Sequence, residues 1–370
     1  MSSNLKSYEL NEIKEVKIYG RRDEKINPIA FFWTGSGFEA NVKASELWMN
    51  VEVDYDVFEQ WISVEINGEI MARTMLNKGR YDVCLFRGMN KDNVKNVRVY
   101  KEVQPMPGDD KNMLIIHSLK TDGEFEEVPE KRMKLEFIGD SITSGEGSIG
   151  AKKETDWISM FFTAHRNYAL LTAKELDADF RIISQSGWGT ACAWNNDPNC
   201  TLPKYYEKVC GVINGERNEK LGAHEDNDFK SWKPDVIVVN LGTNDDAAFY
   251  NDEYVDEKTG ERFKMHKNED GSYNKQDVSI FENAVINFLV KLRKYNSESK
   301  IIWAYGMIGI PMMEFIYNAV STYKNEFNDS NVWVTQLPNV TDETVGAKMH
   351  PGVLAHKESA KVLAELIKNL

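Results

Sequence analysis

One change in the hydrophobic pattern, near residue 130, constrains the fold of this chain more than any other feature of its sequence. Before it, apolar residues stand in short runs that alternate with polar residues, as in VRVY at 97–100. After it, continuous apolar runs alternate with longer segments of helical period, beginning at Lys134. Alternation with period 2 is typical of half-buried strands, whereas buried strands between helices are typical of a parallel sheet. A length of 370 residues fits two domains, which we place at 1–129 and 130–370.

The first 129 residues are expected to form an all-β domain. About eight short runs rich in Val, Ile, Trp, Phe and Tyr follow one another, and no long helical period separates them. The dipeptide Asn67-Gly68 between two of these runs is typical of a two-residue hairpin turn. Closely spaced strands of this kind predict an antiparallel β-sandwich or jelly roll. The runs lie at 30–33, 40–44, 48–55, 61–66, 69–75, 81–86, 94–103 and 113–118.

Residues 130–370 are expected to form a three-layer α/β/α domain with a parallel sheet. The run VIVVNL at 236–241 is almost entirely apolar, as a strand that is buried on both faces requires. Ligands of such folds bind beyond the carboxyl ends of the strands. Strands are predicted at 134–139, 180–184, 235–241, 300–305 and 332–335, and helices at 156–176, 279–295, 312–324 and 353–369.

The charge and the apolar runs exclude several classes of partner. The formal net charge is −13, from 45 basic and 58 acidic residues. An acidic chain is unsuited to general binding of nucleic acid or of anionic membranes, so we expect neither as a partner. The longest uncharged apolar-rich run, 301–313, is too short for a membrane span of about 20 residues. The N-terminal residues show no signal-peptide pattern, so we expect a cytoplasmic protein, or a secreted one if a signal has been removed.

Four short polar segments stand at the predicted strand ends of the second half. They are IGDSIT at 138–143, SQSGWGT at 184–190, NLGTNDD at 240–246 and KMHPG at 348–352. Each segment alone is explained by a helix cap or a turn. Because the carboxyl ends of parallel strands meet at one edge of a sheet, the four together predict an active site there.

The residues of these segments fit acyl transfer through a serine. This reaction needs a nucleophile, a base and donors that face the developing oxyanion. Ser141 would be the nucleophile, and His350 the base that takes its proton. The backbone N–H groups of Ser141 and Gly187 and the side-chain amide of Asn244 would form the oxyanion hole. No HExxH motif or comparable cluster of ligands occurs, so we expect neither a metal nor another cofactor.

The four segments, in this order, resemble the Ser, Gly, Asn and His blocks of the SGNH (GDSL-type) hydrolase superfamily. The resemblance spans about residues 134–370. With an all-β domain before the strand LEFIGDSITSGEG, the whole chain is similar to carbohydrate esterase family 2. This resemblance implies a jelly-roll domain followed by an SGNH hydrolase domain. It also implies a serine esterase that removes O-acetyl groups from plant cell-wall polysaccharides or oligosaccharides, such as acetylxylan and acetylmannan.

One position departs from the superfamily. Its members usually carry an Asp three residues before the His, and here that position is Ala347. Some members of carbohydrate esterase family 2 use a Ser–His dyad in which a main-chain carbonyl orients the His. We therefore expect a dyad of Ser141 and His350, with Asp342 as the alternative orienting group.

The substrate side of the site is less determined by the sequence. Trp188 follows Gly187 directly, and its indole ring can either stack on a sugar ring or pack under the loop. The charged segment 250–276 contains the hairpin pattern DEKTGERF and forms a lid, an oligomer contact or a solvated surface hairpin. An SGNH-type lipid esterase or thioesterase, or a glycan-binding protein with secondary catalysis, remain alternative functions. A homo-oligomer is a possible assembly.

Overall fold

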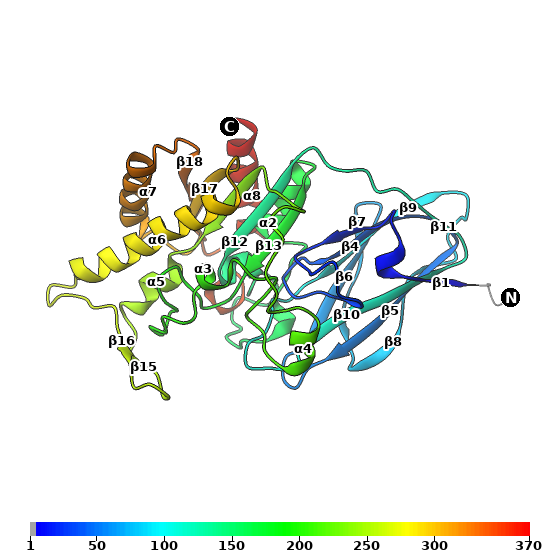
Figure 1. Ribbon diagram of the computed structural model, residues 1–370, viewed down its shortest axis with the longest axis horizontal. Coiled ribbons are helices and arrows are strands. Elements are labelled where there is room, and N and C mark those ends of the chain that lie inside the picture. Colours follow the sequence, from blue (N-terminus) through cyan, green and yellow to red (C-terminus); the bar gives the residue numbers. More distant parts are fainter. Residues whose placement is uncertain (1–4) are drawn as a thin grey trace. The chain divides into compact units, whose positions relative to one another are not determined.

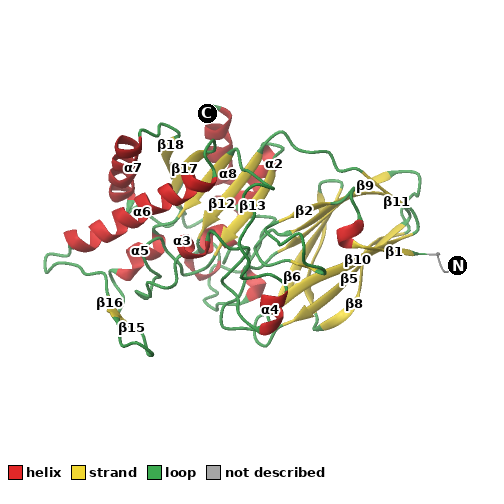
Figure 2. Ribbon diagram, viewed as in Figure 1, coloured by secondary structure: helices red, strands yellow, loops and turns green. Residues whose placement is uncertain are grey.

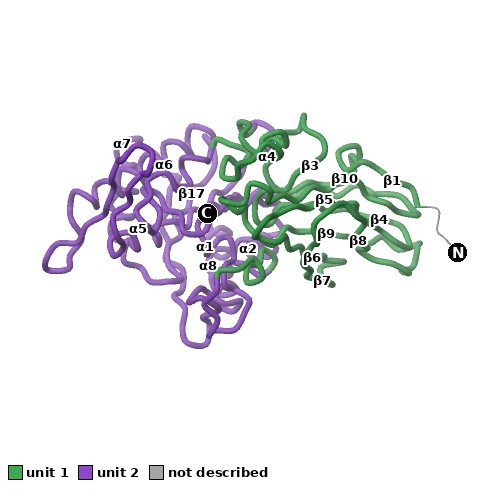
Figure 3. Tube along the Cα trace, turned by 90° about the horizontal axis from the view of Figure 1, so that it is seen from below, with its two compact units in different colours: residues 1–131, 157–165, 207–227 green, residues 132–156, 166–206, 228–370 purple. Residues whose placement is uncertain are grey.

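The computed structural model describes residues 5–370, which divide into two compact units (Figure 3). Unit 1 comprises residues up to 131 together with 157–165 and 207–227. Unit 2 comprises residues 132–156, 166–206 and 228–370. Two segments of the second half of the chain thus belong to the first unit. The domains 1–129 and 130–370 stay a prediction from the sequence.

Unit 1 is built on two antiparallel sheets, as expected for the first part of the chain (Figure 2). One sheet has the order β1-β10-β5-β8, with β3 beside β10, and the other has the order β11-β4-β9-β6-β7, with β2 beside β4. Every second residue of β4 (38, 40 and 42) and of β5 (49, 51 and 53) contributes to one apolar core. The strands are β1 Lys6–Glu9, β2 Lys17–Tyr19, β3 Ile29–Ala30, β4 Gly37–Lys43, β5 Glu46–Asp54, β6 Gln60–Ile66, β7 Glu69–Leu76, β8 Gly79–Arg87, β9 Val94–Lys101, β10 Met113–Thr121 and β11 Glu124–Glu126, and the helices are η1 Leu10–Glu12, η2 Ser159–Phe161 and α4 Glu216–Lys220.

The helix predicted over 156–176 is wrong in its first half. The helix begins only at Tyr168, where the side chain of Asn167 caps it by accepting the N–H of Leu170. The apolar residues before it have another use, because Trp157 and Phe162 pack into a small core of unit 1. Met160, which lies between these two residues, is 42% exposed, and Trp157 is only partly buried. The helical spacing therefore predicted neither the structure of this segment nor which of its apolar side chains are buried.

Unit 2 carries a five-stranded parallel sheet of order β13-β12-β14-β17-β18, which confirms the α/β fold (Figure 1). Helix α2 packs against α8, and α6 packs against α7. From β12 the chain moves in one direction along the sheet to β13, and it then crosses back over β12 to β14 and continues in the other direction to β17 and β18. Because crossovers between parallel strands are right-handed, connections that run in opposite directions lie on opposite faces, so the two helix pairs cover opposite faces of the sheet. The elements are β12 Lys134–Gly139, β13 Asp179–Ser184, β14 Val236–Asn240, β15 Tyr254–Val255, β16 Arg262–Phe263, β17 Lys300–Gly306, β18 Val332–Leu337, α1 Ser141–Ser144, α2 Tyr168–Glu175, α3 Leu202–Tyr205, α5 Thr243–Ala248, α6 Lys275–Tyr295, α7 Met313–Phe327, η3 Ala347–Met349 and α8 Val353–Lys368.

The register of the sheet brings three of the four polar segments to one edge. Gly139, the last residue of β12, pairs with Ser184 of β13 on one side and with Asn240 of β14 on the other. These three strands therefore end at the same level, and the segments that follow them leave the sheet side by side. This is also the point where the connections depart to opposite faces, which is where open α/β sheets bind ligands. Within residues 5–370, no helix has the length and apolarity that crossing a membrane requires.

Candidate active site

Ser141 stands at a sharp turn between β12 and α1. The carboxylate of Asp140 caps the helix by accepting the N–H of Ile142 at 3.0 Å. The turn needs Gly139, because a Cβ there would lie 2.0 Å from the hydroxyl of Thr143 and 2.7 Å from the carbonyl of Asn240. Ser141 is the first residue of α1, a position whose N–H has no partner inside a helix. Its hydroxyl and its N–H are therefore both held at the edge of the sheet.

His350 meets Ser141 in the geometry of a nucleophile and its base. The Nε2 atom of His350 lies 2.9 Å from the Ser141 Oγ, and its Nδ1 atom lies 2.9 Å from the carbonyl oxygen of Lys348. A carbonyl oxygen can only accept, so Nδ1 donates to it and Nε2 keeps its lone pair towards the serine hydroxyl. This is the tautomer that a general base needs.

The backbone just before His350 aims the carbonyl at the ring. Lys348 and Met349 both adopt the left-handed conformation, with φ of 53° and 59°, although neither is glycine. Two such residues in succession store local strain, a feature typical of functional sites. The Lys348 carbonyl thus occupies the place at Nδ1 where an orienting carboxylate would otherwise stand.

Neither position 347 nor Asp342 provides a carboxylate at this place. Ala347 is completely buried. Its backbone lies so close to Gly147 that a Cβ added to Gly147 would be 2.3 Å from the Ala347 carbonyl oxygen. Asp342 points to solvent, with 94% of its side chain exposed, and its carboxylate binds the ammonium group of Lys152 at 2.9 Å.

Glu146 places a buried negative charge beside the His350 ring. Its carboxylate lies 3.0 Å from the Lys348 ammonium nitrogen and 3.8 Å from His350 Nε2. Burial opposes ionisation, but the charges of His350 and Lys348 and a hydrogen bond from Ser186 together hold the pKa of Glu146 below its usual range. One carboxylate therefore connects the loop after the nucleophile, the loop of Gly187 and the loop of His350.

Gly187 takes a conformation that other residues rarely adopt. Its φ is +79°, and a Cβ would meet the Trp194 ring at 2.9 Å. The carbonyl of Gly187 accepts the N–H of Trp194 at 3.0 Å, which closes the loop back on itself. A glycine is required here for both the turn and the close approach of the indole.

Asn244 is the second residue of the short helix α5, which follows β14 after two residues, and its amide nitrogen has two partners. It donates to the carbonyl of Trp188 at 3.0 Å and to the carboxylate of Asp140 at 3.2 Å. Burial raises the pKa of Asp140 to about 7, and the neighbouring carboxylates of Asp245 and Glu146 add to this shift. The amide of Asn244 therefore joins the loop that carries Trp188 to the turn that carries Ser141.

Asp245 organises the loop that follows Gly187. Its buried carboxylate accepts the backbone N–H groups of Thr190, Ala191 and Cys192 at 2.7–3.4 Å. Burial raises the pKa of Asp245 to about 6, against the effect of these three donors. The adjacent Asp246 makes a different contact, because its carboxylate accepts a hydrogen bond from the hydroxyl of Tyr273 at 2.6 Å.

The two tryptophans of this loop lie in different environments. Trp188 is 7% exposed and packs its ring against Tyr205, with ring centroids 5.1 Å apart. Trp194, against Gly187, is 49% exposed. Ring exposure therefore favours Trp194 over Trp188 as an aromatic surface beside the site.

The structure brings Ser141, Gly187, Asn244 and His350 to one edge of the unit 2 sheet, and it adds residues that the sequence analysis did not single out. These are Asp140, Glu146, Asp245 and Lys348. Asp140 and Asp245 are sequence neighbours of Ser141 and Asn244, and this adjacency could have predicted that they lie in the site. Glu146 stands between two glycines, and nothing else in the sequence indicates that it lies beside His350. No group of three or more His, Cys, Asp or Glu side chains in residues 5–370 is arranged to hold a metal ion.

The chain is similar in sequence to one protein family and to curated proteins whose names include an esterase. Residues 135–363 match the family described as GDSL-like Lipase/Acylhydrolase. The chain is 33% identical over 184 residues to an acetylxylan esterase / glucomannan deacetylase of Cellvibrio japonicus, which covers 49% of this chain and 48% of that protein. It is 23% identical over 346 residues to the cellulase/esterase CelE of Acetivibrio thermocellus, which covers 91% of this chain and 37% of that protein. The chain thus spans about half or less of the length of these curated relatives.

One solved structure is similar over nearly its whole length. It is an acetyl xylan esterase, Est2A, from the rumen bacterium Butyrivibrio proteoclasticus, with a TM-score of 0.97 and 46% sequence identity. The match covers 98% of this chain and 98% of that chain. The similarity therefore includes both units and not only the part that carries Ser141 and His350.

Proposed function

Because the chain belongs to the GDSL-like lipase and acylhydrolase family, we propose that it is a serine esterase that removes O-acetyl groups from cell-wall oligosaccharides or polysaccharides such as xylan and mannan. The observation that carries the reaction type is the contact of 2.9 Å between His350 Nε2 and Ser141 Oγ, with the Lys348 carbonyl behind the ring. The names of the relatives support the acetyl group and the sugar. Cell-wall glycans are uncharged or weakly charged, which suits a chain of net charge −13.

In the proposed mechanism, Ser141 Oγ attacks the acetyl carbonyl carbon while His350 Nε2 takes the hydroxyl proton. The negative charge moves to the carbonyl oxygen, which faces the N–H groups of Ser141 and Gly187 and the amide of Asn244. His350 then protonates the sugar oxygen as the ester bond breaks, which leaves an acetyl-enzyme. Water, deprotonated by His350, releases acetate and restores Ser141.

Glu146 has a role in this proposal that its charge and position support. The imidazolium that forms in each step has no carboxylate at Nδ1, because the Lys348 carbonyl occupies that place. The carboxylate of Glu146, 3.8 Å from Nε2, supplies the negative charge from the other side of the ring. Lys348 holds this carboxylate in position at 3.0 Å.

We expect Glu146→Gln to lower kcat/KM for acetate release about tenfold, because the variant keeps the shape of the side chain but loses about 1–2 kcal/mol of imidazolium stabilisation. Because the imidazolium forms only as the reaction proceeds, the loss should fall on kcat and leave KM unchanged. A purely structural role would change KM as well. Asp342→Asn is the matched control and leaves kcat and KM unchanged, and a loss of orders of magnitude there would instead make Asp342 the group that orients His350.

We also propose a jelly roll for the β sheets of unit 1. Strands β3 to β10 alternate between the two sheets except at the β6–β7 hairpin, and their orders are β3-β10-β5-β8 and β4-β9-β6-β7. One long β ribbon folded over itself produces this alternation, which supports the jelly roll. The role of Trp188 in binding sugar, a homo-oligomer and a cytoplasmic location stay predictions from the sequence.

The test of the proposed function is the release of acetate from acetylated xylo-oligosaccharides and acetylated glucomannan, with the Ser141→Ala protein as the blank. We expect release that depends on Ser141, and faster cleavage of p-nitrophenyl acetate than of p-nitrophenyl butyrate. Preference for butyrate or longer acyl chains, without release from either glycan, would favour a lipid esterase or thioesterase. Glycan affinity that survives Ser141→Ala, with negligible turnover in the parent, would favour a binding protein.

A further inference from the structure

The segment between α5 and α6 forms a small hairpin whose two aromatic residues face the same way. Strands β15 and β16 form the hairpin labelled in Figure 1. They pair Tyr254 with Phe263 and Val255 with Arg262. Directly opposed residues of an antiparallel pair lie on the same face of the hairpin, and successive residues lie on opposite faces. Tyr254 and Phe263 therefore form one aromatic face, and Val255, 41% exposed, lies on the other.

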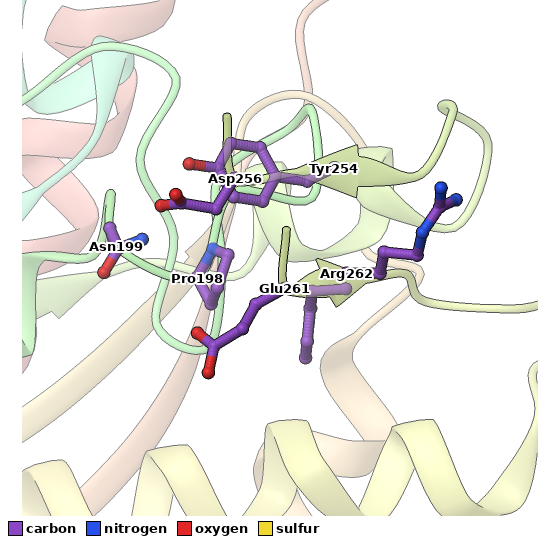
Figure 4. A pocket seen from close by; sticks show the side chains of 7 residues that line it. Pro198, Asn199, Tyr254, Asp256, Glu261 and Arg262 are labelled. Atoms are coloured by element: carbon purple, nitrogen blue, oxygen red, sulfur yellow. The ribbon is translucent and has the colours of Figure 1, made fainter. Parts of the chain in front are cut away.

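The aromatic face closes a pocket against the turn at 198–199. A cavity of about 340 Å³ lies between the two, lined by Tyr254 and Phe263 from the hairpin and by Pro198 and Asn199 from the turn. Figure 4 shows Tyr254, Pro198 and Asn199 around this space, with Glu261 at its margin. The volume is at the lower end of the range of ligand pockets, which fits one segment of a longer molecule rather than a whole ligand.

The polar groups of this hairpin pocket favour a neutral ligand rich in hydroxyls. Arg262 is already paired with Glu253 at 2.5 Å, so its charge is not available to an anionic ligand. The Asp256 carboxylate accepts the N–H groups of the hairpin turn at 2.8 Å and holds the frame. The exposed Glu261 carboxylate has no ion-pair partner in residues 5–370 and can accept hydroxyl groups. Two aromatic rings beside such an acceptor suit a sugar, which has apolar faces and a polar edge.

The pocket is attached firmly to the loop that carries Gly187. The amide nitrogen of Asn196 donates to the carbonyls of Ala248 and Asp252 at 2.9 Å, and its oxygen accepts the N–H of Met265 at 2.8 Å. The side chain of Asn196 therefore connects the loop at 187–200 to the end of α5 and to the base of the hairpin. Since Trp194 lies against Gly187 and Asn199 follows five residues later, the turn is at most about 18 Å from that tryptophan.

We propose that the hairpin pocket is a second carbohydrate subsite, which binds a neutral sugar residue of the same oligosaccharide at a distance from the acetyl group cleaved at Ser141. This inference rests on the proposed function for its substrate class. On this inference, the hairpin segment between α5 and α6 makes the enzyme prefer long substrates over short ones. A chain long enough to reach the pocket gains contacts that a single acetylated sugar lacks, so the segment lowers KM for long substrates and leaves the chemical step unchanged.

The test compares the double variant Tyr254→Ala/Phe263→Ala with Val255→Ala, the matched control on the opposite face of the hairpin. The substrates are acetylated xylohexaose and p-nitrophenyl acetate. We expect the double variant to raise KM for the hexasaccharide about tenfold with unchanged kcat. All proteins should cleave p-nitrophenyl acetate equally, which also reports that the site has folded. Glu261→Gln, which leaves the aromatic face intact, should raise KM for the hexasaccharide in the same direction.

The outcomes separate this inference from the function on which it rests. A KM for the hexasaccharide within twofold of the parent value in the double variant, with acetate release intact, overturns the subsite and leaves the esterase. If the parent releases no acetate, the proposed function fails, and calorimetric titration of unacetylated xylohexaose then decides on the pocket alone. Weaker binding by the double variant than by Val255→Ala supports the subsite, and equal binding rejects it.

Discussion

Ser141→Ala is expected to lower kcat/KM for acetate release by about 10³- to 10⁶-fold, because it removes the hydroxyl that His350 would activate as the nucleophile. Ser141 Oγ lies 2.9 Å from a ring nitrogen whose lone pair faces it, and the strand-to-helix turn holds it there. The measurement is the initial rate of acetate release at saturating and at low substrate concentrations. An alanine variant that keeps more than about a tenth of the parent rate would show that the nucleophile lies elsewhere.

A second serine–histidine pair in the same unit provides the control. Ser148 Oγ lies 2.7 Å from His356 Nε2, a contact as short as that of the proposed dyad. His356 Nδ1, however, accepts the N–H of Tyr168 at 3.0 Å, so its proton is on Nε2 and the ring donates to the serine. Burial, with a smaller effect of His350, lowers the pKa of His356 to about 3. This ring cannot activate Ser148, and Ser148→Ala should keep acetate release within a few-fold of the parent.

Asn244→Ala is expected to lower kcat by about 10²- to 10³-fold with little change in KM. In the proposed mechanism the amide donates to an oxygen whose negative charge develops only on the way to the tetrahedral intermediate, so its loss affects the chemical step more than ground-state binding. On this proposal, the bond of 3.0 Å to the Trp188 carbonyl orients the amide before substrate arrives, and the bond of 3.2 Å to Asp140 is the one exchanged for the oxyanion.

Steady-state kinetics on p-nitrophenyl acetate distinguishes this role from others. Asn251→Ala is the matched control, because this asparagine lies just beyond the same helix and, within residues 5–370, its side-chain amide donates to the Ala247 carbonyl alone, at 2.8 Å. Its kinetics should match those of the parent. A raised KM with unchanged kcat in Asn244→Ala would make Asn244 a binding residue and would leave the oxyanion to the backbone N–H groups alone.

The sequence analysis predicted the class of fold and the family because both rest on local patterns. The run at 236–241 is apolar enough to be a strand buried on both faces, and β14 confirms it at Val236–Asn240. The amphipathic pattern of α6 is equally local, since Phe281, Val285, Phe288 and Leu292 recur at helical spacing and are buried. The resemblance to SGNH hydrolases and to carbohydrate esterase family 2 rested on four short segments in order, and the similarity of nearly the whole chain to an acetyl xylan esterase confirms it.

The helix expected over 156–176 shows where local sequence patterns are insufficient, because only Tyr168–Glu175 is helical. Periodicity is a property of a short window of sequence, but Trp157 and Phe162 pack in unit 1, against Phe58 and Val103. Those partners lie more than 50 residues away in the chain, so no window of sequence contains them.

What the sequence determined by itself is the order of strands and helices, the residues Ser141, Gly187, Asn244 and His350 as candidates, and the kind of chemistry they suit. Their meeting at one edge of a sheet also followed from sequence, because parallel strands present their carboxyl ends together. The tertiary structure alone decided what surrounds them. Lys348 contacts His350 Nδ1 through its backbone carbonyl, and because every residue has such a carbonyl, the type of side chain cannot predict this contact. Glu146 is important because folding buries it 3.8 Å from a ring that lies 204 positions further along the chain.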